Sequence, residues 1–154
     1  MNGNKQNEFL VTKRSYTNFH LSMEYKLVGK DGFVNGGVQF RSERIANPPN
    51  EMKGYQADIG AGHSGCLYDE SRRNKFDARG TDEQIKRIEK AGDWNRYEII
   101  GAGPHIQIIL NGEKTVDYTE ADSAIPQEGF IGLQIHGGNK AEISFRNISI
   151  GETK

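Results

Sequence analysis

The sequence contains little cysteine and proline, almost no net charge, and no long apolar run. Its single cysteine, Cys66, cannot form an internal disulfide, and no Cys/His spacing indicates a structural zinc site. With 20 lysines and arginines against 21 aspartates and glutamates, it has no basic excess to suit a nucleic acid or a membrane surface. No apolar run approaches the length of a transmembrane helix. We therefore expect neither a nucleic acid nor a membrane as a partner.

Several catalytic and targeting motifs are also missing. The sequence has no GxSxG nucleophile elbow, P-loop, HExxH zinc motif or dinucleotide fingerprint. The first residues, Met1 to Lys5, lack the hydrophobic centre of a signal peptide, so the residues alone give no compartment. These absences exclude the easily recognised enzyme classes but not catalysis itself.

What the sequence does contain is glycine and short stretches of alternating polarity. Its 154 residues suit a single domain, 1–154, whose residues 1–7 we expect to be flexible, and its 19 glycines favour turns and strands. The clearest alternation runs from Phe19 to Leu27, where every second residue is hydrophobic. A change of parity near Asn147 predicts a β-bulge in the last strand. Strands are predicted at 9–12, 19–27, 38–41, 55–59, 94–100, 106–110, 114–118, 130–136 and 141–150.

Only one segment has helical character. Thr81-Asp-Glu-Gln84 has the spacing of a capping box, and Ile85 and Ile88 give one apolar side, which predicts a short surface helix. Residues 42–53 contain Pro48-Pro49 and predict a loop. About nine or ten two-faced strands with one helix indicate an all-β fold, a sandwich of two antiparallel sheets of the jelly-roll kind.

Polar chemistry is concentrated in residues 55–73. Gln56 and Asp58 fall on one face of a predicted strand, because side chains alternate along it, and apolar residues occupy the other face. Glycines then predict a turn that brings Tyr68, Asp69, Glu70, Arg72 and Arg73 back to the end of this strand. His63 lies within that turn, and we expect it to be exposed. A hairpin with a solvated charged loop explains the stretch equally well.

Three strands far apart in the sequence share an unusual polar face. Its pairs are Gln39 with Arg41, Gln56 with Asp58, and Gln134 with His136. Such groups on the concave side of a curved sheet suit a carbohydrate, whose hydroxyls bind polar groups and whose ring faces stack on aromatic side chains. The candidate aromatic platforms are Tyr55 and Tyr68, whereas Trp94 fits the core better. We expect Asp58 and His136 to converge on one pocket together with Arg41, Tyr68 and Glu70.

The residues alone leave the chemistry of this site open. A retaining glycosidase needs two neighbouring carboxylates, but the alternate positions Gln56 and Asp58 hold an amide and a single carboxylate. His136 fits three roles: a base, a ligand of a metal ion with Asp58 or Glu70, or an ordinary hydrogen-bonding histidine.

Seven short motifs, taken in order and spacing, resemble the 3-keto-disaccharide hydrolase family. They are Asn35-Gly-Gly-Val-Gln-Phe-Arg41, Gly54-Tyr-Gln-Ala-Asp-Ile-Gly60, Gly65-Cys-Leu-Tyr-Asp-Glu70, Trp94-Asn95, Leu110-Asn-Gly112, Gly132-Leu-Gln-Ile-His-Gly137 and Phe145-Arg-Asn-Ile148. The resemblance covers nearly the whole chain from Phe9. It implies a fold like that of the concanavalin-type glucanases and lectins, and a periplasmic or secreted protein. The family normally has a further segment before the position of Phe9, which we expect this chain to lack.

The resemblance also implies an activity, the cleavage of 3-keto-glycosides. A ketone at C3 acidifies the C2 proton, so that a base can remove it and the C1 substituent leaves by β-elimination, after which water adds back. This chemistry needs one base and one group that stabilises the enolate.

The resemblance implies roles for the polar residues as well. The base would be His136 or Asp58, with Arg41, Tyr68 or a bound divalent cation at the oxyanion, and Glu70 as a further catalytic candidate. The sugar would contact Gln39, Gln56, Tyr55, Tyr68, Gln134 and Arg72. A non-catalytic carbohydrate-binding module is the alternative function, and the sequence does not give the oligomeric state.

Overall fold

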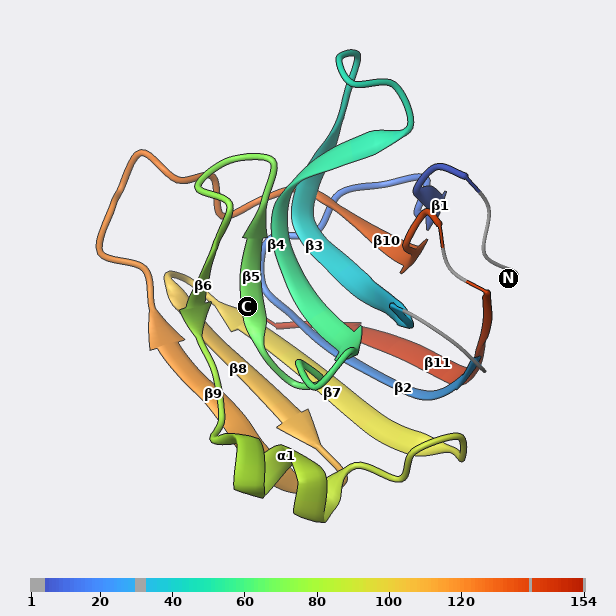
Figure 1. Cartoon of the computed structure of the whole chain (residues 1–154). Coiled ribbons are helices and arrows are strands. Elements are labelled where there is room, and N and C mark those ends of the chain that lie inside the picture. Colours follow the sequence, from blue (N-terminus) through green and yellow to red (C-terminus); the bar gives the residue numbers. More distant parts are fainter. Residues whose placement is uncertain (1–4, 30–32, 139, 154) are drawn as a thin grey trace.

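The computed structural model describes residues 5–29, 33–138 and 140–153. Within these ranges the chain forms eleven strands and one helix (Figure 1). They are β1 (Glu8–Val11), β2 (Phe19–Gly29), β3 (Asn35–Ile45), β4 (Glu51–Gly60), β5 (Leu67–Glu70), β6 (Lys75–Ala78), α1 (Asp82–Ile88), β7 (Asn95–Ala102), β8 (His105–Leu110), β9 (Glu113–Thr119), β10 (Phe130–Ile135) and β11 (Ala141–Glu152).

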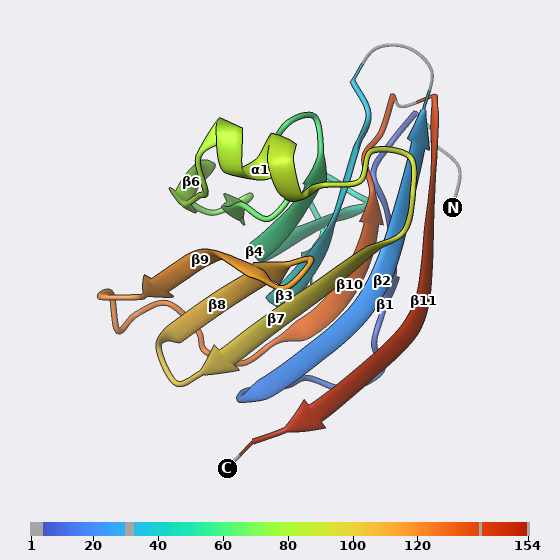
Figure 2. The same ribbon diagram turned by 90° about the horizontal axis from the view of Figure 1, so that it is seen from below.

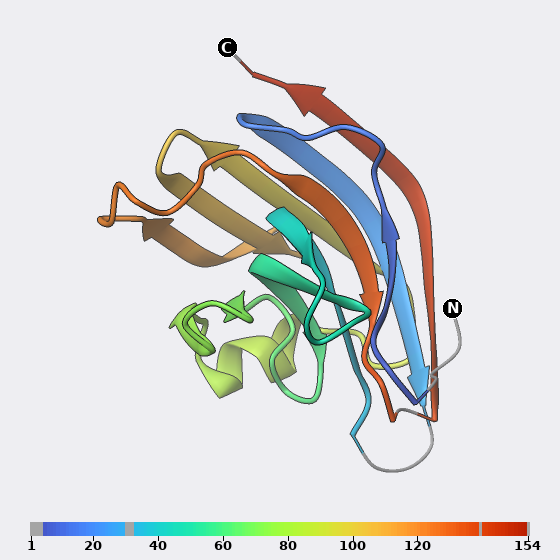
Figure 3. The same ribbon diagram turned by 90° about the horizontal axis from the view of Figure 1, so that it is seen from above.

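These strands form two antiparallel sheets that lie one over the other (Figures 2 and 3). One has six strands in the order β1-β10-β3-β4-β5-β6, and the other has five in the order β11-β2-β7-β8-β9. The all-β sandwich is therefore confirmed. Because β10 lies between β1 and β3, it brings residues from the end of the chain beside residues from its first third; Gln134, for example, is opposite Gly37.

The hydrophobic core fills the space between the sheets. From the six-stranded sheet it contains all six residues whose inward orientation follows from the alternation: Val38, Phe40, Ala57, Ile59, Leu133 and Ile135. From the five-stranded sheet it receives the apolar side of β2, starting with Phe19, whose ring packs edge-on against Phe40 at 6.0 Å between centroids. The opposite side of the six-stranded sheet, called the outer face below, carries Gln39, Gln56 and Asp58, whose side chains are linked by hydrogen bonds.

Two local predictions from the sequence are confirmed. The Thr81 hydroxyl caps α1 by accepting a hydrogen bond from the backbone N–H of Gln84 at 3.1 Å, and both helical isoleucines are buried. In β11 the pairing with β2 shifts register between Arg146 and Ser149, and Asn147 has a φ of 52°. This is the predicted bulge.

One loop prediction is wrong. Residues 42–53 are mostly strand, because β3 continues to Ile45 and β4 begins at Glu51. The two prolines lie in the short turn between the strands, where they interrupt no ladder hydrogen bond. For residues 55–73 the structure contradicts the alternative of a solvated charged loop, because Tyr68, Asp69 and Glu70 belong to β5, which pairs with β4.

The expected flexibility of residues 1–7 falls partly outside the described residues, which begin at residue 5. Asn7 is held at both ends of its side chain: it donates to Glu51 at 2.7 Å and accepts from the backbone N–H of Gly137 at 2.7 Å. Across the described ranges, no helix has the length and apolar character needed to cross a membrane.

Candidate functional site

A pocket of about 320 Å³ opens on the outer face of the six-stranded sheet. Four of the residues predicted to converge line it: Asp58 from β4, Tyr68 and Glu70 from β5, and His136 just after β10. They meet because β4 pairs directly with β5, and because only one strand, β3, lies between β4 and β10 in the sheet. The other lining residues are Phe33, Asn35, Gln56, His63 and Phe76.

Asp58 is the best-fixed group of this pocket. Its backbone carbonyl accepts hydrogen bonds from the Tyr97 hydroxyl at 2.8 Å and from the N–H of Gly65 at 3.0 Å. Its carboxyl Oδ1 accepts from Gln56 Nε2 at 2.6 Å, and the residue is only 6% exposed. Burial raises the pKa of this carboxyl to about 7, and hydrogen bonds from Gln56 and Asn35 oppose that rise. Near neutral pH both of its protonation states are therefore populated, as a general acid or base requires.

The half-buried imidazole of His136 faces the same pocket. Its Nδ1 lies 2.7 Å from the carbonyl oxygen of Gly137, so this nitrogen is a donor, and in the neutral imidazole Nε2 is then the proton acceptor. The ring of Phe33 packs edge-on against the imidazole at 5.0 Å between centroids. This geometry gives the pocket a second group able to accept a proton.

Two further polar groups complete the set. Burial raises the pKa of the Glu70 carboxyl, with a contribution from Glu51, while the attraction of His136 lowers it. Burial and nearby carboxylates raise the pKa of the Tyr68 phenol, so it remains protonated at neutral pH and can donate a hydrogen bond.

Sequence reasoning missed several residues of the pocket. The prediction that His63 is exposed is wrong, because the residue is half-buried and its ring lies 4.9 Å from that of Phe76. Its Nδ1 is buried and has no hydrogen-bond partner among the described residues. Phe76 also packs edge-on against Tyr68 at 5.1 Å. Phe76 belongs to β6, a strand that no alternation in the sequence indicated, whereas Asn35 stands in the first family motif but lies before the strand predicted at 38–41.

Arg41 does not reach this pocket. The pairing of β3 with β4 shifts register between Phe40 and Glu43, and Arg41 has a φ of 48°, so the bulge turns its side chain to the other side of the sheet. There its Nε and Nη2 donate to the carbonyl of Thr17 at 3.3 and 2.9 Å. The expected convergence of Arg41 with Asp58 is therefore wrong.

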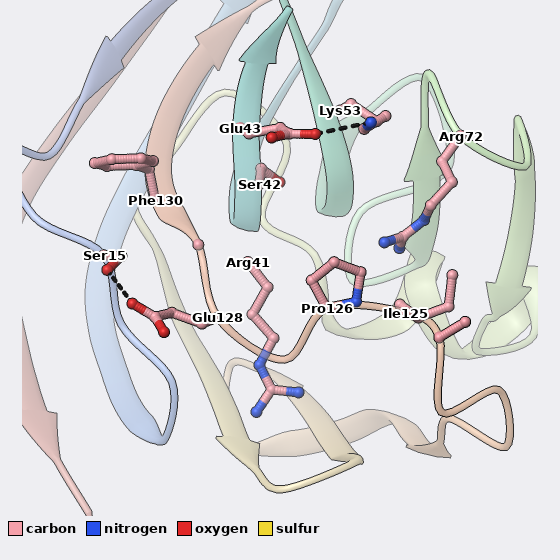
Figure 4. Close-up of a pocket in the computed structure, with 12 residues that line it drawn as sticks. Ser15, Arg41, Ser42, Glu43, Lys53, Arg72, Ile125, Pro126, Glu128 and Phe130 are labelled. Atoms are coloured by element: carbon pink, nitrogen blue, oxygen red, sulfur yellow. Dashed lines mark hydrogen bonds and ion pairs between the residues drawn. The ribbon is translucent and has the colours of Figure 1, made fainter.

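Arg72 lies in the same second cavity as Arg41, a cleft of about 610 Å³ (Figure 4). Its Nε donates to Asp69 at 2.7 Å, and its guanidinium lies over the ring of Tyr55, 4.6 Å from the centroid. The structure places neither arginine in the pocket of Asp58.

The structure also separates three other expected sugar contacts from that pocket. Tyr55 is fully buried in the core, where it stacks on Phe40 and donates to Glu120, so it offers no platform. Gln39 and Gln134 are on the predicted face but are fully buried. The side-chain amide of Gln134 has no partner among the described residues. The guanidinium carbon of Arg146 lies 3.9 Å from the centroid of the Trp94 ring. Trp94 is only half-buried, contrary to the expected core position.

The pocket does not fit the divalent cation that the resemblance left open. Among the described residues, no group of three or more histidine, cysteine, aspartate or glutamate side chains could hold a metal ion. The side chains that face the pocket instead suit proton transfer and hydrogen bonding to an uncharged polar ligand.

Comparisons with solved structures agree with the fold. The carbohydrate-binding module CBM66 of Bacillus subtilis is 18% identical, with 97% of this chain and 84% of the module covered and a TM-score of 0.74. A Bacillus subtilis protein with a galectin-like fold is 11% identical, with coverages of 97% and 79% and a TM-score of 0.71. These two likenesses concern the jelly-roll fold alone.

A further solved structure and a family sequence model also match the chain. A candidate glycosyl hydrolase from Parabacteroides distasonis is 25% identical, with 96% of this chain and 84% of the other covered and a TM-score of 0.64. A comparison with curated proteins finds no match. The sequence model of the 3-keto-alpha-glucoside-1,2-lyase-like domain matches residues 1–151. The chain therefore belongs to this 3-keto-disaccharide hydrolase family, as its motifs predicted.

Proposed function

We propose that this protein is a carbohydrate-active enzyme that cleaves 3-keto-glycosides by removing the C2 proton and eliminating the C1 substituent. The observation that carries the proposal is the buried carboxyl of Asp58, whose pKa is raised to about 7 in a pocket shared with His136, Tyr68 and Glu70. The family of the chain and its likeness to a candidate glycosyl hydrolase support this proposal.

The reaction begins when a base takes the proton from C2, which leaves an enolate whose charge lies on the C3 oxygen. The enolate collapses to restore the C3 ketone and form a C1=C2 double bond, while the bond from C1 to the glycosidic oxygen breaks. A proton passes to the departing oxygen, and water then adds across the double bond to give the free 3-keto sugar. Only proton transfers and the stabilisation of one oxyanion are required of the protein.

Asp58 fits the role of base, because a carboxylate with a pKa near 7 is far more basic than an ordinary one. The Tyr68 hydroxyl is the donor proposed for the enolate oxygen, in place of Arg41. His136 offers its Nε2 as a second proton acceptor near the reacting carbons. Because Gln56 holds the Asp58 carboxylate at 2.6 Å, the base is oriented before the substrate binds.

The size and lining of the pocket suit the sugar ring. Its volume of about 320 Å³ lies near the lower end of the range of roughly 300–1,000 Å³ for small-molecule sites. Phe33, which is 54% exposed, and Phe76 both line the pocket, so both can pack against an apolar ring face. We propose that one 3-keto-glycosyl unit occupies the pocket.

A non-catalytic carbohydrate-binding module is the second candidate function. Its support is the fold shared with the CBM66 module at a TM-score of 0.74. A binding module needs no base, so the raised pKa of Asp58 favours the enzyme.

The test is to incubate the protein with a chromogenic 3-keto-α-glucoside and follow release of the aglycone, with and without a chelator. We expect release in both conditions, and none from the parent glucoside, whose C2 proton is not acidic. Asp58→Asn should abolish release, whereas Asp117→Asn, an exposed aspartate on β9, should not. Calorimetric binding of the 3-keto-glucoside without release would contradict the enzyme and favour the module.

A further inference from the structure

A continuous chain of hydrogen bonds runs across the outer face to Asp58. The Ser42 hydroxyl donates to Gln39 Oε1 at 2.6 Å, and Gln39 Nε2 donates to Gln56 Oε1 at 3.1 Å. Gln56 Nε2 then donates to Asp58 Oδ1 at 2.6 Å. All four residues are buried, and Asp58, the most exposed of them, is only 6% exposed. Water therefore has little access to the chain except where Gln56 and Asp58 line the pocket.

The direction of this chain matches an ionised Asp58. A carboxylate only accepts hydrogen bonds, so the amide of Gln56 must present its N–H to Asp58 and its oxygen to Gln39. Gln39 must then present its own oxygen to Ser42, whose hydroxyl supplies the one proton needed at that end. Reversing the two amides would place the Gln56 oxygen against Asp58, an arrangement that only the protonated acid tolerates.

Ser42 supports this direction, because its contact with Gln39 Oε1, at 2.6 Å, is the shortest that its hydroxyl makes to an acceptor. The backbone oxygens of Phe40 and Tyr55 lie 2.9 and 3.3 Å from Ser42 Oγ, and both are acceptors. Without the hydroxyl, Gln39 Oε1 loses this donor, and the observed direction loses one of its hydrogen bonds. Removing one hydroxyl would therefore favour the reversed chain.

Gly37 gives Gln56 the space to reach Asp58. A Cβ built on Gly37 would lie 2.7 Å from Gln56 Cδ and 2.8 Å from Gln56 Cγ, which real Cβ atoms do not tolerate. Gly37 is not among the glycines with positive φ, so the absent side chain, rather than special backbone freedom, is what this position requires. A methyl group here would push the Gln56 amide away from the carboxyl.

We propose that Ser42, Gln39 and Gly37 are positioning residues that hold the amide N–H of Gln56 toward Asp58 and so favour the carboxylate, the form that acts as a base. The claim about catalysis rests on the proposed function, whereas the claim about the carboxyl does not. None of these three residues needs to touch the substrate.

The test is a carbon-13 NMR titration of the Asp58 carboxyl, without substrate, in the wild type, Ser42→Ala and Gly37→Ala. Losing the donated hydrogen bond should raise the pKa of Asp58 by about one unit in each variant. The rising limb of the pH profile of kcat/KM for a 3-keto-glucoside should move to higher pH by the same amount. At a pH below this limb, kcat/KM of each variant should therefore be about tenfold lower than that of the wild type. Ser144→Ala and Gly151→Ala, at a half-buried serine on β11 and a glycine with open space around it, should leave the titration unchanged.

The outcomes separate this proposal from the proposed function. Variants that fold, by circular dichroism, but titrate like the wild type would overturn the chain even if turnover is normal. A raised pKa with no turnover in any protein would support the chain and contradict the enzyme. If Ser42→Ala does not fold, Gly37→Ala tests the same amide from β3 without removing any polar group.

Discussion

Replacing Asp58 by asparagine should make the protein more stable and inactive. The pKa of this carboxyl is about 7 in the fold against an ordinary 3.8, and each unit corresponds to about 1.4 kcal/mol, so its ionisation costs roughly 4 kcal/mol of stability. Because the folded pKa is the raised one, stability is full below pH 4 and is lost as the pH rises through 7. Asparagine carries no charge, and its oxygen can still accept from Gln56.

Urea unfolding at pH 4, 6 and 8 measures this effect. We expect Asp58→Asn to exceed the wild type by up to about 4 kcal/mol at pH 8, and to differ little at pH 4. Asp117→Asn is the control of opposite sign, because Lys114 and His105 lower the pKa of that exposed carboxyl to about 2, so its charge is favourable in the fold. An Asp58→Asn protein that is less stable than the wild type at pH 8, or a difference that does not shrink toward pH 4, would refute the reasoning.

Three other substitutions test the assignment of the site and the core. His136→Ala should abolish aglycone release while leaving the thermal midpoint nearly unchanged, because a half-buried pocket residue supports little packing; an active but destabilised variant would make it a structural histidine. Arg41→Met should leave release per folded molecule unchanged, since Arg41 lies in the other cavity, and a folded but inactive variant would return it to the site. Leu133→Ala should lower the free energy of unfolding by about 2–5 kcal/mol in urea, and a loss well under that range would place Leu133 outside the core.

Alternation of polarity predicted the parts of the site that lie on regular strands. Gln56 and Asp58 follow from the parity of β4, and His136 from the parity of β10, because the register is continuous from Tyr55 to Gly60 and from Gly132 to Ile135. To predict that these residues converge, it was enough to assume that the polar faces of neighbouring strands lie on the same side of the sheet. The order of the strands, which places β3 between β10 and β4, was not itself predicted.

The alternation of polarity could not predict where a strand has a β-bulge, or how deeply a side chain is buried. Arg41 was assigned to the wrong side because a single bulge after Phe40 reverses the side chains beyond it. Gln39 and Gln134 are on the predicted face, yet both are fully buried, since alternation tells which face a residue occupies but not what covers it. His63 was missed because the path of a glycine turn depends on tertiary contacts, here with Phe76.

The most direct test of the central claim is deuterium exchange at C2 of a 3-keto-α-glucoside in heavy water. Removal of the C2 proton by the protein predicts deuterium at C2 of the sugar product, together with aglycone release, and Asp58→Asn should show neither. The parent glucoside should gain no deuterium with any of the proteins. Saturating binding of the 3-keto-glucoside to the wild type, with no deuterium at C2 and no release, would contradict the account.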